Sequence, residues 1–334
     1  MDNNEINQIF DTFKQLNVIV IGDVMVDSYL WGKVDRVSPE APVPVVSVLT
    51  RENRLGGAAN VSLNIKALGA TPWLFSVVGD DDKGRKLKKM LAKENLCSDG
   101  VFTDLTRLTT VKSRIISKGQ HVARVDEECT DEINSELENT IVEAVQKLIG
   151  EKKIDVIVFV DYDKGVITPT LFDRVNEMAI SKGIPTAVDP KKRNFNHYKN
   201  ISLFKPNFKE FTDGVGVTVE KHDFETIKKL SGAFKQKQNF KIIFITLSEL
   251  GVFINNGFQE QYFPANIRYV ADVSGAGDTV ISMASLALAS GLNHGTLAWM
   301  SNLAGGLVCE KNGVAPVNKD QLINEMLSQK TALF

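Results

Sequence analysis

The segment Asp272–Thr279, with the sequence D-V-S-G-A-G-D-T, combines small residues with a carboxylate at the start of an apolar run. That run has helical spacing and ends at Gly291, a typical helix stop, so Gly275–Gly277 are expected at a helix start. Backbone N–H groups there lack intrahelical partners, the helix dipole adds positive charge, and small side chains let a phosphate come close. Because Asp278 lies inside this anion cradle, the pattern predicts phosphoryl transfer. The alternative is a tight turn in which Asp278 caps the helix.

A second glycine-rich helix start lies in the N-terminal half, where Gly56 and Gly57 precede Asn60. The glycines permit close approach of a polyol, and Asn60 can present an amide to sugar hydroxyls; the alternative is a plain turn capped by Asn60. Asp23 and Asp27 follow the first apolar strand, at the strand end where α/β sheets bind ligands. Carboxylates only accept hydrogen bonds and therefore suit paired hydroxyls. We expect Asp27 to bind the sugar and Asp23 to be a surface residue.

Two segments further along the chain fit a nucleotide and its metal ion. Asn207 and Glu210 have the N-x-x-E spacing of a helix capping box. A glutamate at a helix start can also organise water around magnesium, which keeps several waters and needs few protein ligands. Both roles are compatible. Thr246 and Ser248 follow another strand, where their hydroxyls can meet nucleotide phosphates.

Two buried strands end in an acid followed closely by a lysine. The pairs are Asp161 with Lys164 and Asp189 with Lys191. Two lysines at one sheet edge can hold a second phosphate, one that belongs to the substrate. The alternative is that both lysines are solvated loop residues.

These residues have to be positioned by an alternating order of strands and helices, which predicts parallel βαβ units and an α/β fold. Pro42–Leu49 and Val111–Asp126 break the alternation, and Lys118–Gln120 favours a hairpin turn. We expect them to form a small β-sheet lid that excludes water from the site. No linker or repeat divides the chain. The expected strands are 18–21, 74–78, 154–160, 185–188, 203–204, 242–246 and 252–254, and the expected helices are 61–68, 84–94, 169–181 and most of 279–309.

Bulk composition excludes several classes of function. The 334 residues carry 39 basic and 41 acidic side chains without a basic block, which argues against nucleic acid or an anionic membrane as partners. The N-terminus lacks the pattern of a signal peptide and instead reads as a docking helix, and no apolar run is long enough to span a bilayer. Three scattered cysteines fit reduced thiols, so a cytoplasmic location is expected. The histidines have no zinc-site spacing (His121, His197, His222 and His294).

The motifs G-G-A-A-N and G-A-G-D-T resemble, in order and separation, the two signatures of the ribokinase/PfkB family of sugar kinases. The resemblance covers essentially the whole chain. It implies one kinase domain over 1–334, with a ribokinase-like, Rossmann-type three-layer core, a lid formed by about 31–50 and 108–126, and ATP and Mg²⁺ as the phosphate donor and its ion. The site residues it implies are Asp278 as base; Gly275, Ala276 and Gly277 as anion hole; Asn207 and Glu210 as the magnesium and phosphate motif, Glu210 acting through water; and Thr246 and Gly251 beside the nucleotide.

A narrower resemblance concerns Arg36–Val45, which is similar to a lid segment of the D-glycero-β-D-manno-heptose 7-phosphate kinases of this family. Ser248 also fits that branch. The branch implies phosphorylation of the C1 hydroxyl to give the 1,7-bisphosphate, a precursor of ADP-heptose and lipopolysaccharide. The expected sugar-side residues are Asp27, Gly56, Gly57, Asn60, Asp161 and Asp189, with Lys164, Lys191, Lys112 or Arg114 near the phosphate.

The chain departs from that branch at 192–194, where Lys-Arg-Asn stands in place of Gly-x-Asp, and at Ser274, where threonine is usual. A kinase of another sugar or sugar phosphate, such as fructose, fructose 6-phosphate or ribose, is therefore the first alternative. A non-catalytic sugar-phosphate sensor is the second. The nucleotidyltransferase motif H-x-G-H of bifunctional members is not in this sequence, so adenylyl transfer is expected from another protein. Exposed lid strands favour a homodimer formed through the lid.

Overall fold

The computed structural model describes residues 2–266 and 268–329, which form a nine-stranded sheet and a separate four-stranded sheet. The strand order of the large sheet is β13-β12-β11-β10-β9-β8-β1-β4-β5. Neighbouring strands are parallel from β11 to β5, whereas β12 and β13 run antiparallel at one edge. This arrangement confirms the predicted α/β class. The strands are β1 (Asn17–Gly22), β4 (Thr71–Gly79), β5 (Val101–Asp104), β8 (Val156–Val160), β9 (Thr186–Asp189), β10 (Leu203–Phe204), β11 (Ile242–Thr246), β12 (Val252–Asn255) and β13 (Glu260–Phe263).

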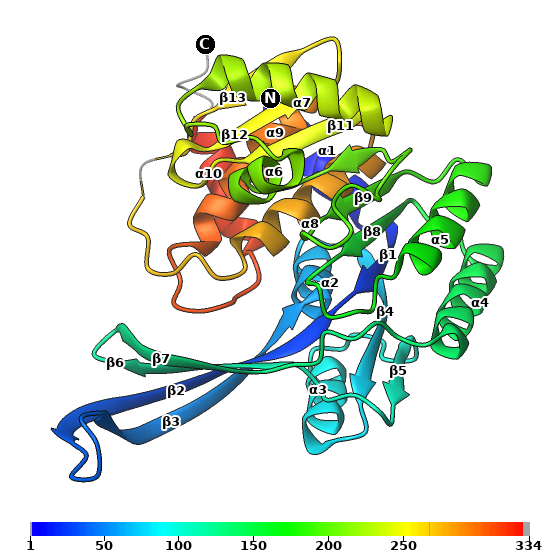
Figure 1. Ribbon diagram of the computed structural model, residues 1–334. Helices are drawn as coiled ribbons and strands as arrows, with labels where there is room; N and C mark the ends of the chain where they lie inside the picture. The colour runs from blue at the N-terminus through cyan, green and yellow to red at the C-terminus, as the bar shows by residue number, and fades with distance from the viewer. Residues whose placement is uncertain (1, 267, 330–334) are drawn as a thin grey trace.

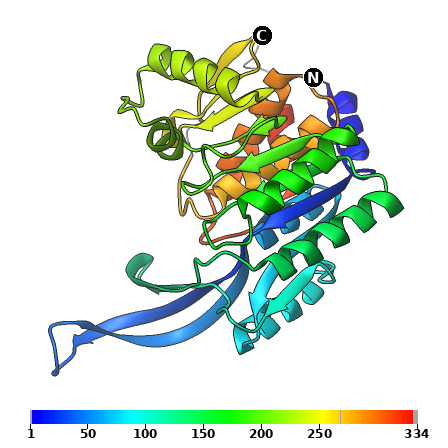
Figure 2. The ribbon, with the colours of Figure 1, turned by 45° about the vertical axis from the view of Figure 1, so that its right-hand side comes forward.

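Helices cover both faces of this sheet and complete three layers (Figures 1 and 2). One face packs against α1 (Asn3–Phe13), α2 (Ala58–Ala67), α3 (Asp82–Lys93), α8 (Ala276–Ala289), α9 (His294–Val308) and α10 (Lys319–Gln329). The other packs against α4 (Ser135–Glu151), α5 (Pro169–Ser181), α6 (Phe208–Val215) and α7 (Phe224–Gln238), and a short 3-10 turn, η1, covers Ser248–Leu250.

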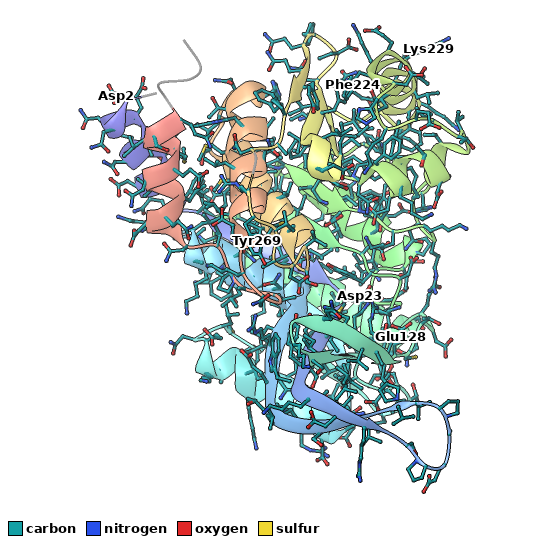
Figure 3. All side chains as sticks on the ribbon, turned by 90° about the vertical axis from the view of Figure 1, so that its left-hand side faces the viewer. Asp2, Asp23, Glu128, Phe224, Lys229 and Tyr269 are labelled. Carbon is teal, nitrogen blue, oxygen red and sulfur yellow. The ribbon has the colours of Figure 1, made fainter. Side chains whose placement is uncertain are left out.

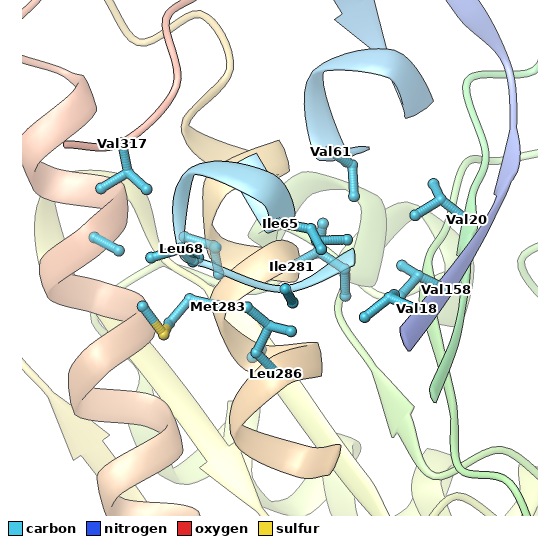
Figure 4. Packing of buried hydrophobic residues seen from close by; sticks show 14 of the residues in the cluster. Val18, Val20, Val61, Ile65, Leu68, Val158, Ile281, Met283, Leu286 and Val317 are labelled. Atoms are coloured by element: carbon cyan, nitrogen blue, oxygen red, sulfur yellow. The ribbon is translucent and has the colours of Figure 1, made fainter. Parts of the chain in front are cut away.

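The alternation of side chains along each strand produces the two cores. In β1, Val18 and Val20 join one cluster of buried residues, whereas Ile19 and Ile21 join the other. Figure 4 shows Val18 and Val20 with Ile65 of α2 and Ile281 of α8 in the first cluster. Complete burial of one such side chain contributes about 1.5–3 kcal/mol to folding. Packing of α8 in this core therefore holds in place the helix start that carries Asp278.

Helix ends follow the local sequence rules. Helix α5 has the predicted bounds, because Thr168 caps it by accepting a hydrogen bond from the Leu171 amide at 3.1 Å and Pro169 occupies the first turn. Helix α1 buries Ile6, Phe10 and Phe13 and confirms the predicted docking helix.

The four-stranded sheet has the order β3-β2-β6-β7 and projects away from the core (Figure 1). Its strands are β2 (Val24–Val37), β3 (Pro44–Gly57), β6 (Val111–Ser117) and β7 (Gln120–Glu127). The predicted hairpin turn joins β6 to β7. The sheet includes most of the expected segments 42–49 and 111–126, since β3 begins at Pro44 and β6 and β7 flank the turn, but β2 and β3 extend it down to the core. Asp27 consequently lies within β2, beside Lys112 of β6, and not in a loop at the end of β1.

Two further expectations from composition can be compared with the fold. Cys97, Cys129 and Cys309 are free thiols. Within the ranges that the structure describes, no helix combines the length and the apolar character needed to cross a membrane.

Candidate active site

The G-A-G-D segment starts helix α8 as predicted. Gly275 is the N-cap residue, with φ of +82°, a left-handed conformation that favours glycine. Asp278 lies inside the first turn of the helix and not at the N-cap position, so the alternative of a capping aspartate is wrong. A Cβ atom on Gly277 would lie 3.7 Å from Nζ of Lys205, its nearest neighbour. A Cβ atom at this position would therefore make only ordinary contacts with the residues around the turn.

The Asp278 carboxylate is buried, with 2% of its surface exposed, and both of its oxygens accept hydrogen bonds. Asn60 Nδ2 donates to Oδ2 at 2.7 Å, and the Tyr162 hydroxyl donates to Oδ1 at 2.7 Å. Burial raises the pKa of Asp278 to about 7; the two donors oppose this rise, and the nearby Asp189 and Asp27 add to it. A carboxyl group with a pKa near neutrality is suited to accept and release a proton.

Asp27 forms a buried ion pair with Arg114 across the lid strands. Burial raises the pKa of Asp27, and Arg114 opposes this effect. Gly56 makes room for the pair, because a Cβ atom at this position would overlap Oδ2 of Asp27. Gly57 is the N-cap of α2 with φ of +60°, so Asn60 lies inside that helix and does not cap it. Gly56 and the ion pair thus belong to the lid strands, and Asn60 lies in the first turn of α2, which β3 leads into directly.

Asp23 has a structural role that the sequence did not indicate. It lies where the small sheet meets the core (Figure 3) and is buried, contrary to the expected surface position. Its carboxylate accepts hydrogen bonds from the backbone amides of Tyr162, Lys164 and Val166 at 2.8, 3.0 and 3.0 Å. Asp23 therefore fixes the loop that follows β8.

Asp161 begins that loop and is also buried. Its Oδ1 accepts a hydrogen bond from the Asp163 amide at 2.8 Å, and its Oδ2 accepts one from the Tyr198 hydroxyl at 2.6 Å. Burial and the neighbouring Asp23 raise the pKa of Asp161 to about 7. Groups of this chain thus already occupy both oxygens of a residue expected to bind the sugar.

The expected phosphate-binding lysines are not free loop residues. Lys164 Nζ lies 3.0 Å from Oε2 of Glu128, and its side chain is only 13% exposed. Lys191 forms an ion pair with Glu210. The alternative of solvated lysines is therefore wrong for Lys164.

Asp189 forms a third pair, and its partner is Lys205, which the sequence did not single out. Lys205 Nζ lies 2.9 Å from Oδ1 of Asp189, and both side chains are buried. The pair lies beneath Gly277 and adds a positive group under the anion cradle.

Asn207 and Glu210 form the predicted capping box at the start of α6. The Glu210 amide donates to Asn207 Oδ1, and the Asn207 amide donates to Glu210 Oε2, each at 2.8 Å. Among the described residues, no group of three or more His, Cys, Asp or Glu side chains is arranged to hold a metal ion. A magnesium ion would therefore take few ligands from the protein, as its usual coordination by water allows.

The remaining nucleotide-side residues lie in the turn between β11 and β12. Thr246 ends β11 and forms a bridge with Asn207. Ser248 begins η1 with φ of +55°, and Gly251 has φ of +101°, where a Cβ atom would overlap the carbonyl oxygen of Phe263. This turn and the capping box therefore lie next to each other.

A glycine-rich helix start with a buried carboxylate, at the edge of a three-layer α/β sheet, is the arrangement expected of an α/β phosphotransferase. The sequence profile of the pfkB family carbohydrate kinases matches residues 15–321, and the chain belongs to this family. It is accordingly an ATP-dependent carbohydrate kinase.

Several known proteins resemble the chain. It is 36% identical over 325 residues to the bifunctional protein HldE of Pelobacter propionicus, a match that covers 97% of this chain and 66% of that protein. Identity to the bifunctional protein HldE of Aliarcobacter butzleri is 39% over 311 residues, covering 92% and 64%. The chain thus spans slightly less than two thirds of the length of these relatives.

Solved structures show the same fold at lower identity. Phosphofructokinase-2 from Escherichia coli, in complex with substrates and products, matches with a TM-score of 0.77 at 20% identity, over 94% of this chain and 99% of that chain. Arabidopsis thaliana ribokinase, complexed with ribose and ATP, matches with a TM-score of 0.72 at 17% identity, over 93% and 98%. These matches confirm the predicted ribokinase-like fold.

Proposed function

We propose that this kinase transfers the γ-phosphate of ATP to the C1 hydroxyl of D-glycero-β-D-manno-heptose 7-phosphate, with Asp278 as the base and Gly275–Gly277 as the anion hole. The observation that carries the proposal is the Asp278 carboxylate, buried at the start of α8 with a pKa of about 7. The choice of a heptose phosphate is supported by the lid segment Arg36–Val45 and by the bifunctional HldE relatives.

In the proposed reaction the γ-phosphate lies over Gly275–Gly277 while the sugar lies beneath the lid, with hydroxyls on Asp27, Gly57 and Asn60. Asp278 accepts the proton of the C1 hydroxyl as the C1 oxygen forms its bond to the γ-phosphorus. The bond from that phosphorus to the bridging oxygen breaks, and ADP leaves with the electron pair. Positioning and charge stabilisation supply most of the rate in such transfers.

The sugar phosphate is proposed to bind among Lys112, Arg114, Lys164 and Lys191. Burial lowers the pKa of Lys112, and repulsion from Arg124 and Lys164 lowers it further. A dianionic phosphate at this place would offset that repulsion. Lys164 and Lys191 can contribute once they exchange their own glutamate partners for the ligand.

The nucleotide is proposed to lie along Asn207, Thr246, Ser248 and Gly251. Magnesium, when bound with ATP, neutralises phosphate charge. Glu210 is the carboxylate that would hold its water ligands, because Glu210 already presents an ordered carboxylate at the start of α6. Asp161 and Asp189 then act at the sheet edge by shaping the loops that carry Lys164 and Lys191.

We further propose that residues 1–334 act as one kinase domain, with the four-stranded sheet as its lid. The lid exposes Val37, Val43, Val48 and Leu49. Exposed apolar side chains on strand surfaces favour pairing with a second copy, so a homodimer through the lid is part of the proposal.

The test is ADP release from the purified protein with ATP and magnesium across four acceptors: heptose 7-phosphate, fructose 6-phosphate, fructose and ribose. We expect strong preference for heptose 7-phosphate and a loss of several orders of magnitude in Asp278→Asn. Preference for another acceptor, which the Lys192–Asn194 departure favours, would replace the substrate but keep the base. Near-normal turnover by Asp278→Asn would refute the assignment of the base, and sugar-phosphate binding without any ADP release would favour a sensor.

A further inference from the structure

Tyr162 connects the lid, the sheet edge and the Asp278 carboxylate. It follows β8 in the loop that Asp23 holds, and its own amide donates to Asp23 Oδ2 at 2.8 Å. Its hydroxyl donates to Oδ1 of Asp278 at 2.7 Å. The ring lies near two ammonium groups, with its centroid 5.9 Å from Lys112 Nζ of the lid and 5.3 Å from Lys191 Nζ.

We propose that Tyr162 is a positioning residue for the base: its hydroxyl fixes the orientation of the Asp278 carboxylate and stabilises the ionised form of that carboxylate. The inference rests on the proposed role of Asp278 as the base. It adds a residue that has no assigned role in any of the sequence motifs.

The geometry explains why the tyrosine hydroxyl matters for orientation. Asn60 from α2 holds one oxygen of Asp278, and Tyr162 from the β8 loop holds the other. With one donor on each oxygen and the two donors on different elements, the carboxylate cannot rotate without losing a hydrogen bond. Each oxygen still has a second lone pair, so a substrate hydroxyl can approach a carboxylate already held in place.

The proton in the hydrogen bond between Tyr162 and Asp278 stays on the tyrosine hydroxyl. Burial and the Asp278 charge raise the pKa of Tyr162 well above its ordinary value, so the hydroxyl keeps its proton and acts as a donor. A donor to a carboxylate favours its charged form. Tyr162 therefore offsets part of the effect that burial has on Asp278.

The other charges that face Asp278 come from several elements. Asp27 of β2 and Asp189 at the end of β9 disfavour its ionised form. Lys191 interacts with it favourably, and Lys205 lies beneath the adjacent Gly277. All of these charges stay in place when the Tyr162 hydroxyl alone is removed, so its contribution can be isolated.

The experiment compares Tyr162→Phe with wild type and with Tyr198→Phe. Tyr198→Phe is the matched control, because it removes a buried hydroxyl that donates to a different carboxylate, Asp161 Oδ2 at 2.6 Å. The first readout is the pH dependence of kcat/KM for ADP release. Loss of a hydrogen bond to a charged group should shift the acidic limb of the pH profile of kcat/KM to higher pH by about one unit in Tyr162→Phe. The loss of rate should then be about tenfold greater at pH 6 than at pH 9. Tyr198→Phe acts on Asp161 and should leave the titration midpoint of Asp278 unchanged.

The second readout does not need turnover. The Asp278 carboxyl signal is followed by ¹³C NMR in protein labelled at aspartate, and it is assigned as the signal missing in Asp278→Asn. We expect its titration midpoint to be about one pH unit higher in Tyr162→Phe than in wild type. An unchanged midpoint would overturn the inference. If no acceptor is phosphorylated, the proposed function fails, and the titration still decides the role of Tyr162.

A second variant covers the case in which Tyr162→Phe does not fold. Incorporation of 3-fluorotyrosine at position 162 alone keeps the shape and makes the hydroxyl a stronger donor. The Asp278 midpoint and the acidic limb should then both move to lower pH, opposite to the expected change in Tyr162→Phe. A shift in the same direction, or no shift, would contradict the proposal.

Discussion

Replacing Asp278 with asparagine should stabilise the protein, and the gain should increase with pH. The ordinary pKa of an aspartate, 3.8, is raised to about 7 at this position because the carboxyl is buried. The folded protein therefore binds this proton more tightly than the unfolded chain does. The associated stability is fully present below pH 4, is lost as pH rises through 7, and is absent above pH 8.

The size of the effect follows from the same two values. A difference of about three pH units corresponds to about 4 kcal/mol, of which about 3 kcal/mol is lost between pH 5 and pH 8. Asparagine carries no charge and avoids the cost of burying an ionised carboxylate, and it can still form hydrogen bonds with both partners of Asp278. Its oxygen can accept from Asn60, and its amide can donate to Tyr162, since a tyrosine hydroxyl also accepts hydrogen bonds.

The assay is the free energy of unfolding from urea titrations of wild type and Asp278→Asn at pH 5, 6, 7 and 8. We expect the difference between the two proteins to grow in favour of the variant by about 2–3 kcal/mol over this range. Asp11→Asn is the control. Lys14 holds the pKa of the exposed Asp11 below its ordinary value, so the stability that the Asp11 charge contributes is lost only as pH falls below about 4. The difference in free energy of unfolding between Asp11→Asn and wild type should therefore be constant from pH 5 to 8. A flat or opposite trend for Asp278→Asn would refute the reasoning.

Two other substitutions separate the anion cradle from the sugar side. Gly277→Ala should leave the melting temperature unchanged or raise it. Its Cβ meets only ordinary contacts, such as Lys205 Nζ at 3.7 Å, and alanine is favoured over glycine in a helix by about 1 kcal/mol. The same substitution should lower kcat/KM for ATP at least ~10-fold, because the added methyl group fills the cradle. Gly56→Ala should instead displace the Asp27 carboxylate from Arg114, lower stability by about 1–3 kcal/mol, and weaken sugar binding in calorimetric titrations; retained affinity for the sugar would count against a role of Asp27 in binding it.

Strong local signals in the sequence predicted most of the sheet and the helices next to the site. Continuous β-branched runs identified β1, β8 and β11, and the Pro169 start fixed α5. Helices α4 and α7 carried no motif and were not anticipated, although their periodicity is regular. The first half of β2 was not predicted as a strand, because a strand that leaves one sheet to enter another has no local marker where it does so.

The site shows the same division between local and long-range information. Gly275–Gly277, Asn60 and Asp278 could be singled out because each belongs to a short motif. The contacts of Tyr162 and Asp23 could not, because they are hydrogen bonds between residues more than a hundred positions apart. No spacing rule within one segment contains that information.

The carboxylates at this sheet edge differ in what holds their oxygens, and this difference supports a single base. Asp23 accepts from backbone amides, which leaves it a fixed part of the loop. Burial raises the pKa of Asp27 and of Asp189, but each faces a buried cation that opposes this rise and already pairs with the carboxylate. Asp161 also has a pKa of about 7, but it lies in the loop after β8, where the Asp163 amide and the Tyr198 hydroxyl donate to it, and not at the start of α8. Asp278 alone among these five combines a pKa of about 7 with a place in the first turn of α8, which supports the proposal that it is the base.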